Sequence, residues 1–267
     1  MVRNLVFYAC SFVSSLLLAQ VPISNVYSGL NDEEFTVSGI VTTPEFGISP
    51  EVLFFIQDGS RGLLISYEGN ECTTTQGDEV LITGLRKEVN NMVLLEVVTL
   101  ERITSNNQLP SHQLISDTDL SLSSSLIGNR VTINNVTITD NSNWPEVQSE
   151  VSRSIPITTG TTDFTLTVDR ASYYNGTPVP CNSFSLSGVL AKFDDEIQIL
   201  PFYENELDPL PKLTVDQEVI NFGQIQVDEF SLPELLKYSA SNLVEDIVIT
   251  TSGNFEISEN ETDGYTN

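Results

Sequence analysis

Residues 35–41 read Phe-Thr-Val-Ser-Gly-Ile-Val, and Leu53-Phe-Phe-Ile56, Gly62-Leu-Leu-Ile65 and Val80-Leu-Ile-Thr83 follow soon after. These short runs are rich in β-branched and aromatic residues, and Gly, Asp and Asn separate them, which is typical of strands joined by tight turns. Asp58-Gly59 lies between two of the runs and predicts a hairpin. The first part of the chain is therefore predicted to be a meander of β-strands.

The same pattern continues in the middle of the chain. Several of its runs alternate apolar and polar residues, which places one face of a strand on a core and the other in water, as in small barrels and sandwiches. Phe184-Ser-Leu-Ser-Gly-Val189 also echoes Phe35-Thr-Val-Ser-Gly-Ile40. The echo favours two related modules in tandem; the alternative is that any strand running into a glycine bulge looks like this. Helix is expected to be scarce. The runs are Arg130–Ile133, Val136–Thr139, Phe164–Val168, Phe184–Leu190 and Ile197–Leu200.

Two polar or proline-rich stretches, Asn106–Pro110 and Leu207–Pro211, divide the chain. They predict modules at residues 20–107 and 108–209 and a third unit at 210–267. The third unit carries fewer strand runs than the roughly seven of a complete Ig-like sandwich. We therefore expect the third unit to be incomplete and the chain to be a fragment of a longer protein.

The N-terminal residues 1–19 differ from the rest. Arg3 is their only charge, Leu5–Leu18 is an apolar run, and Ala19 is a small residue before Gln20. This is the pattern of a secretory signal peptide, and its apolar run is shorter than the roughly 20 residues that a membrane-spanning helix needs. We expect cleavage near Ala19/Gln20, an extracellular or periplasmic location and no membrane span.

The charge is strongly acidic. Lys and Arg number 11 and Asp and Glu 37, so the formal net charge is −26. The excess is spread along the whole chain, and no basic cluster marks a nucleic-acid site. Tight binding of nucleic acid by this chain alone is not expected, because phosphate backbones would be repelled.

The first module resembles the OB-fold modules of secreted bacterial proteins. The order and spacing of its runs carry this resemblance, and a looser one extends over the second module. The runs are Val37–Val41, Phe54–Gly59, Gly62–Ile65, Gly77–Gly84 and Asn91–Val97 in the first module, and Leu120, Ile127-Gly128, Val131–Thr137, Phe184–Val189 and Gln198–Pro201 in the second.

The third segment, with Phe222-Gly223, Ser241–Leu243 and Phe255–Ser258, resembles the N-terminal half of an Ig-like extracellular repeat. The resemblance implies an all-β chain of two tandem OB-like small barrels followed by a partial Ig-like β-sandwich. In the proteins it points to, such modules often accompany extracellular nucleases of the endonuclease/exonuclease/phosphatase type, where they are accessory rather than catalytic.

The residues that carry chemistry do not assemble a catalytic motif. His112, the only histidine, lies beside Pro110 in a linker and is predicted to be solvated, and no G-x-S-x-G elbow is present. Cys72 and Cys181 lie far apart in the sequence. They are predicted to be two isolated buried thiols, and the alternative is a disulfide that bridges two modules. Two cysteines and one histidine do not form a zinc cluster, and Asp194-Asp195-Glu196 reads as a hairpin turn more readily than as a calcium site. We expect no catalytic residue, metal or cofactor in this chain.

Aromatic side chains on the middle strands and loops are the candidate binding residues, because OB barrels stack bases or sugars there. Alternation places Phe54 and Phe55 on opposite faces, so one is core and the other is a candidate for exposure. Core or loop packing is the alternative for each candidate. Two functions follow: a non-catalytic binding or spacer region of a secreted multidomain bacterial protein, with a polysaccharide or a protein as partner, or the N-terminal accessory region of a secreted nuclease or phosphoesterase whose catalytic domain lies beyond residue 267. The candidates are Phe54, Tyr67, Trp144, Tyr173 and Tyr174.

Overall fold

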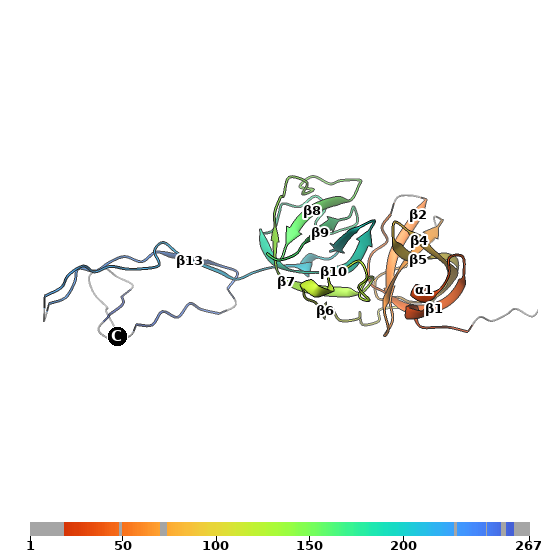
Figure 1. Cartoon of the computed structure of the whole chain (residues 1–267), viewed down its shortest axis with the longest axis horizontal. Coiled ribbons are helices and arrows are strands. Elements are labelled where there is room, and N and C mark those ends of the chain that lie inside the picture. The colour runs from red at the N-terminus through yellow and green to blue at the C-terminus, as the bar shows by residue number, and fades with distance from the viewer. Residues whose placement is uncertain are drawn as a thin grey trace, which may run out of the picture. The chain divides into compact units, whose positions relative to one another are not determined.

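The computed structural model describes residues 19–47, 50–69, 74–226, 229–243, 245–251 and 255–258. It divides into two compact units, residues 1–208 and residues 209–267 (Figure 1). Nearly all of its regular structure is β-strand, as the sequence predicts. The expected signal peptide and Cys72 lie outside the described residues, apart from Ala19 at the end of the leader.

Five strands close the first barrel in the order β1-β2-β3-β5-β4. β3 and β5 run parallel, and the other four neighbouring pairs are antiparallel. A small closed Greek-key barrel of five strands is the OB-like architecture expected for this part of the chain. The strands are β1 (Glu34–Val41), β2 (Glu51–Gln57), β3 (Gly62–Glu68), β4 (Glu79–Val89) and β5 (Met92–Thr104).

A short helix, α1 (Ile23–Ser28), precedes the first barrel and contributes to its core. Ile23 and Val26 are fully buried and belong to the same apolar cluster as Phe54 and Ile65. The sequence analysis does not predict this helix, because one and a half turns carry no measurable periodicity. Its stability comes from the apolar contacts with the barrel, since an isolated helix this short is unstable in water.

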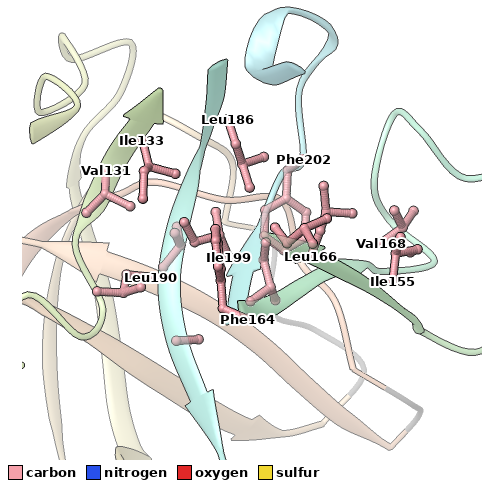
Figure 2. Packing of buried hydrophobic residues seen from close by; sticks show 14 of the residues in the cluster. Val131, Ile133, Ile155, Phe164, Leu166, Val168, Leu186, Leu190, Ile199 and Phe202 are labelled. Atoms are coloured by element: carbon pink, nitrogen blue, oxygen red, sulfur yellow. The ribbon is translucent and has the colours of Figure 1, made fainter. Parts of the chain in front are cut away.

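The second barrel repeats the topology of the first. Its strands pair in the closed order β7-β8-β9-β11-β10, again with a parallel pair between the third and fifth strands. Figure 2 shows the apolar side chains that fill it, among them Phe164, Leu166 and Ile199. Two short strands, β6 (Gln113–Leu114) and β12 (Leu207–Pro209), extend the sheet. The barrel strands are β7 (Arg130–Ile138), β8 (Arg153–Thr158), β9 (Asp163–Val168), β10 (Ser183–Phe193) and β11 (Glu196–Leu200). Two 3-10 turns, η1 (Asp117–Asp119) and η2 (Glu204–Glu206), complete this unit.

The echo between the two modules joins strands that are not equivalent. Phe35–Ile40 lies on β1, whereas Phe184–Val189 lies on β10, the counterpart of β4. The matching glycines are Gly84 of β4 and Gly188 of β10. A Cβ on Gly84 would overlap the carbonyl oxygen of Glu96 on β5, and one on Gly188 would overlap a carbonyl of β11. The two barrels therefore share a topology and this close approach of neighbouring strands. The sequence echo between Phe35–Ile40 and Phe184–Val189 does not mark equivalent strands.

In the described part of the second unit, β13 (Lys212–Val215) and β14 (Tyr238–Ser241) form a two-stranded ladder, and all residues of these two strands are exposed. Residues 219–222 and 247–250, which are rich in β-branched and aromatic residues, are irregular in the structure. Among the described residues of 209–258, the strands of an Ig-like sandwich are not formed, and its Ig-like character stays a prediction. A two-stranded ladder alone cannot bury apolar side chains, because burial needs a second sheet or a helix packed on its face, and the described residues of this unit form neither.

Candidate binding surface

The outer face of β2 and β3 in the first barrel is covered. This face and its neighbouring loops bind ligands in OB folds. Phe55 and Leu64 are cross-strand partners on it, and both belong to an apolar cluster that includes Val131 of the second barrel. Phe46 lies 5.9 Å from Phe55 and 5.3 Å from Phe202, measured between ring centroids. Packing of the second barrel therefore occupies the face on which a ligand would be expected.

The predicted binding residues of the first barrel do not form an exposed site. Phe54 is fully buried inside the barrel, so its ring has no face available for stacking. The expectation that Phe54 or Phe55 is exposed is wrong, because the opposite face of the strand packs against the second barrel. Tyr67 on β3 is half-buried, and its ring lies beside Gly69.

Tyr27 of α1 joins the first barrel to the second. Its hydroxyl donates to the carbonyl oxygens of Gly62, at 2.7 Å, and Ile127, at 3.1 Å. The guanidinium of Arg61 lies 3.3 Å above the Tyr27 ring and donates to the carbonyls of Ile127 and Ser124. Burial raises the pKa of the Tyr27 phenol to about 12. These contacts tie α1, β3 and the segment before β7 together.

Two further hydrogen bonds cross the same interface. The Gly62 amide donates to Oδ1 of Asn129 at 2.6 Å, and the Arg130 amide donates to Oε1 of Gln57 at 3.0 Å. Both donors are backbone amides at the first residue of a strand, and each is satisfied by a side-chain acceptor from the other barrel. The two barrels accordingly form one compact unit.

Asp194 and Asp195 form the predicted hairpin turn between β10 and β11, and Glu196 is the first residue of β11. Asp194 adopts a φ of 51° in this turn. Its amide donates to the carbonyl of Asn90 at 2.9 Å, and its carbonyl accepts from the side chain of Asn91 at 3.2 Å. The hairpin therefore contacts the β4–β5 turn of the first barrel.

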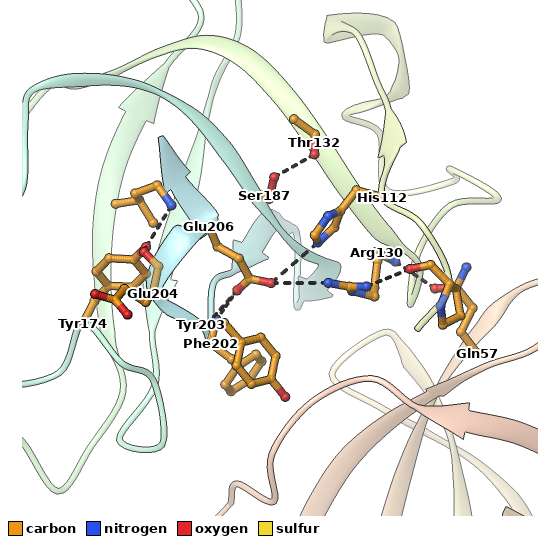
Figure 3. Close-up of polar contacts among 12 residues, drawn as sticks. Gln57, His112, Arg130, Thr132, Tyr174, Ser187, Phe202, Tyr203, Glu204 and Glu206 are labelled. Carbon is orange, nitrogen blue, oxygen red and sulfur yellow. Dashed lines mark hydrogen bonds and ion pairs between the residues drawn. The ribbon is translucent and has the colours of Figure 1, made fainter. Parts of the chain in front are cut away.

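Trp144 and Tyr174 come together in the loops of the second barrel but are buried. Trp144 donates its indole N–H to the carbonyl of Thr177 at 2.8 Å, and its ring meets that of Tyr174 edge-on at 6.4 Å. The Tyr174 hydroxyl donates to the Glu204 carbonyl and accepts from the Leu207 amide (Figure 3). Both side chains thus pack the loops, the alternative weighed for them, and neither presents a face to a ligand.

Tyr173 is the predicted aromatic residue that remains exposed in the second barrel, at 50%. Its ring meets Tyr174 edge-on at 5.4 Å, and its hydroxyl donates to Oε1 of Glu204 at 3.1 Å. That hydrogen bond, together with the carboxylate charge, raises the pKa of the Tyr173 phenol. The ring is therefore held by a ring contact and by a hydrogen bond at its hydroxyl, while half of the side chain stays in solvent.

The loop between β7 and β8 is fastened beside Tyr173. Asn175 accepts from the Ser149 amide at 2.8 Å and donates to the Ser149 carbonyl at 2.9 Å. The Gly176 amide donates to the carbonyl of Pro145 at 2.8 Å. Residues 145–149 and 173–176 therefore form one surface, the Tyr173 surface, with Glu204 at its border.

Glu206 is the centre of a buried polar cluster (Figure 3). Its Oε2 accepts from the Phe202 amide at 2.5 Å and the Tyr203 amide at 2.9 Å, and its Oε1 lies 3.6 Å from Nε2 of His112 and 4.0 Å from Nη2 of Arg130. The prediction that His112 is a solvated linker residue is wrong, because its ring packs against this carboxylate, which lies far along the sequence.

The cluster acts as a structural clasp. Arg130 also donates to the carbonyl of Pro110 at 2.7 Å, so the linker before β6 and the segment after β11 are held by one guanidinium. Desolvation lowers the pKa of Arg130, and burial raises that of Tyr203 beside it. The hydrogen bonds and ion pairs of Glu206 go to protein groups, and the hydroxyl groups of Thr132 and Ser187, drawn beside His112 in Figure 3, are hydrogen-bonded to each other at 2.7 Å. The arrangement is better suited to holding the linker before β6 against the segment after β11 than to acid–base catalysis.

Two global features complete the description. In the described part of the chain, no helix has the length and apolarity needed to cross a membrane. The same residues contain no group of three or more His, Cys, Asp or Glu side chains placed to hold a metal ion.

The comparisons with known proteins reach only part of the chain. No protein-family model matches the chain, and no curated protein matches it. Among solved structures, asparaginyl-tRNA synthetase from Pyrococcus horikoshii is 17% identical over 35% of this chain and 25% of that chain, with a TM-score of 0.31. The hypothetical protein ygiW from E. coli is 21% identical over 32% of this chain and 89% of its own, with a TM-score of 0.27.

The S. pombe Stn1-ten1 complex is 13% identical over 26% of this chain and 57% of that chain, with a TM-score of 0.24. This chain spans about a quarter of the synthetase it matches. At these identities and TM-scores the likeness says nothing of activity or ligand, and the OB-like assignment rests on the strand order described above.

Proposed function

We propose that the chain is a non-catalytic binding region of an exported multidomain protein, and that the Tyr173 surface of the second barrel carries its ligand site. One observation carries the proposal. The β2–β3 face of the first barrel is buried under the second barrel, while the second barrel keeps an exposed aromatic ring that three contacts hold in place.

A fixed aromatic side chain favours binding over a purely spacing role. Tyr173 is held by its backbone as well, because its amide donates to the Phe202 carbonyl at 2.9 Å. A ring that is already ordered loses little conformational entropy on binding, which improves affinity. The fusion of the two barrels makes the first one a rigid base for this surface.

The proposed export rests on residues 1–19, whose charge and apolar run have the pattern of a signal peptide. Expression in a secreting host tests it by intact mass, and the expected N-terminus is Gln20 or a neighbour. A retained leader on secreted protein would contradict the proposal.

Hydrogen–deuterium exchange of the full chain, with and without each candidate ligand class, tests the location of the site. The ligands are soluble polysaccharides, a single-stranded oligonucleotide and an unrelated cationic protein. We expect one class to slow exchange in residues 145–149, 173–176 and 202–206, and to leave β2 and β3 unchanged. Binding without protection of these segments, or no binding in any class, would overturn the proposed function.

A further inference from the structure

The chemical groups at the Tyr173 surface define the class of ligand. Tyr173 is an aromatic side chain that is 50% exposed, and the exposed carboxylate of Glu204 accepts a hydrogen bond from the Tyr173 hydroxyl. An ionised carboxylate has about four acceptor positions, so the one that Tyr173 uses leaves others for hydroxyl donors. An apolar ring beside a hydrogen-bond acceptor complements a sugar, which has an apolar C–H face and a rim of hydroxyl groups.

The charge of the surface excludes anionic ligands. Glu146, Glu150 and Glu204 are exposed on the segments that border Tyr173, and the whole chain has a formal net charge of −26. Arg170 is exposed three residues before Tyr173, and exposed Arg153 donates to Oγ of Ser149 at 3.2 Å, but these two guanidinium groups do not fully offset the three carboxylates. Nucleic acids and acidic polysaccharides would be repelled at moderate salt.

A protein partner would need a wider surface. A stable interface buries about 800 Å² on each partner, which exceeds one exposed tyrosine ring and would have to extend over the β7–β8 loop. Val147 and Val151 are the exposed apolar side chains of that loop. Their substitution therefore separates a protein ligand from a sugar, since a sugar on the Tyr173 ring does not require them.

We infer that Tyr173 and Glu204 form a subsite for a neutral polysaccharide, with one sugar ring stacked on Tyr173 and a sugar hydroxyl donating to Glu204. The inference rests on the proposed function and deepens it by naming the ligand class. Stacking supplies affinity, and the carboxylate orients the ring.

Affinity gel electrophoresis of the full chain tests the subsite. The probes are four neutral polysaccharides, namely hydroxyethylcellulose, barley β-glucan, arabinoxylan and galactomannan, with alginate as the acidic comparison. Retardation by at least one neutral polymer and none by alginate is expected. Tyr173→Ala should weaken that binding about tenfold or more, by analogy with the loss of a base from an aromatic platform, while Tyr173→Trp keeps it.

Two control variants make the result specific. Phe193→Ala removes an equally exposed aromatic ring, at 54%, from the β10–β11 hairpin and should leave binding unchanged. Val151→Ser, at an exposed apolar position outside residues 145–149, should also leave it unchanged. Circular dichroism of each variant checks that it folds, and Tyr173→Phe provides a variant that keeps the ring if Tyr173→Ala does not fold.

The outcomes separate the two proposals. Neutral-polymer binding that Tyr173→Ala leaves intact, binding of alginate alone, or binding of only the oligonucleotide or the cationic protein at this surface overturns the sugar subsite and leaves the binding function standing. Absence of binding to every probe overturns both.

Discussion

Gly62 at the start of β3 lies directly against Gly128, which precedes β7, so that a side chain on either would overlap the backbone of the other. Gly128 also has a φ of 92°, a left-handed conformation that glycine adopts readily. The backbones of the two barrels are therefore in direct contact at this point. Because of this contact, the carbonyl oxygens of Gly62 and Ile127 both lie within hydrogen-bond distance of the single Tyr27 hydroxyl.

Gly62→Ala should lower the free energy of unfolding of the two-barrel unit by about 1–3 kcal/mol, because an added methyl group forces the packed backbones apart. Urea denaturation measures the change. Gly59→Ala is the matched control, since a Cβ at Gly59 meets no atom within 4 Å; it should change stability by less than about 0.5 kcal/mol. Equal stability of the two variants would show that the barrels do not pack in this way.

Tyr27→Phe should lower the free energy of unfolding by about 1–3 kcal/mol, because the carbonyl groups of Gly62 and Ile127 lose their shared hydroxyl donor while the ring contact with Arg61 remains. Denaturant midpoints of the variant and the wild type give the value. The comparison is Tyr67→Phe, which removes a phenolic hydroxyl from the half-buried tyrosine of β3, away from the interface bonds of Tyr27. An effect of Tyr67→Phe as large as that of Tyr27→Phe would contradict a special role for Tyr27.

Strand positions could be predicted from the sequence because they depend on local alternation. Phe54 and Phe55 show the limit of predictions based on local alternation. Alternation correctly places them on opposite faces, but the burial of Phe55 depends on the second barrel, which no local pattern records. His112 is a similar case, since Pro110 and Ser111 indicate a linker while Glu206 supplies its environment from far along the sequence.

The loop positions of the aromatic residues at the candidate site could be predicted from the sequence. Trp144, Tyr173 and Tyr174 were expected in loops, and the structure brings the three rings together there. Which ring stays exposed depends on the hydrogen bonds that Trp144 and Tyr174 make to backbone carbonyls, and composition does not reveal these. The sequence does not single out Glu204, because it is one of 37 acidic residues.

Stability should fall as pH rises from about 10 to about 12. Burial raises the pKa of Tyr27 and of Tyr174 to about 12, from an ordinary value of 10.0. Between these values the unfolded chain loses phenolic protons that the folded chain keeps, so ionisation favours unfolding. Urea midpoints at pH 9 and pH 11 test the sign. The double variant Tyr27→Phe/Tyr174→Phe should show a smaller decrease, and an unchanged decrease would assign it to other groups.

Glu206→Gln should lower the free energy of unfolding by about 1.5–3 kcal/mol, because the substitution removes a charged acceptor from two backbone amides and the counter-charge of Arg130. Glu204→Gln, two residues earlier on the surface, should cost less than about 1 kcal/mol. Thermal denaturation followed by the fluorescence of Trp144, the single tryptophan, compares them. If the two variants were equally stable, Glu206 would not be the centre of the clasp.

Limited proteolysis with chymotrypsin should cut the second unit first. Phe230 is 91% exposed on irregular backbone, whereas Phe193 is 54% exposed but lies in the β10–β11 ladder, paired with Glu196. A protease must unfold several residues around its site, so backbone pairing protects Phe193 although its ring is accessible. Mass spectrometry of an early time point should find cleavage at Phe230 and an intact fragment that contains both barrels. Cleavage at Phe193 as fast as at Phe230 would mean that the hairpin opens readily, and resistance of residues 209–258 equal to that of the barrels would mean that the second unit is packed against a partner.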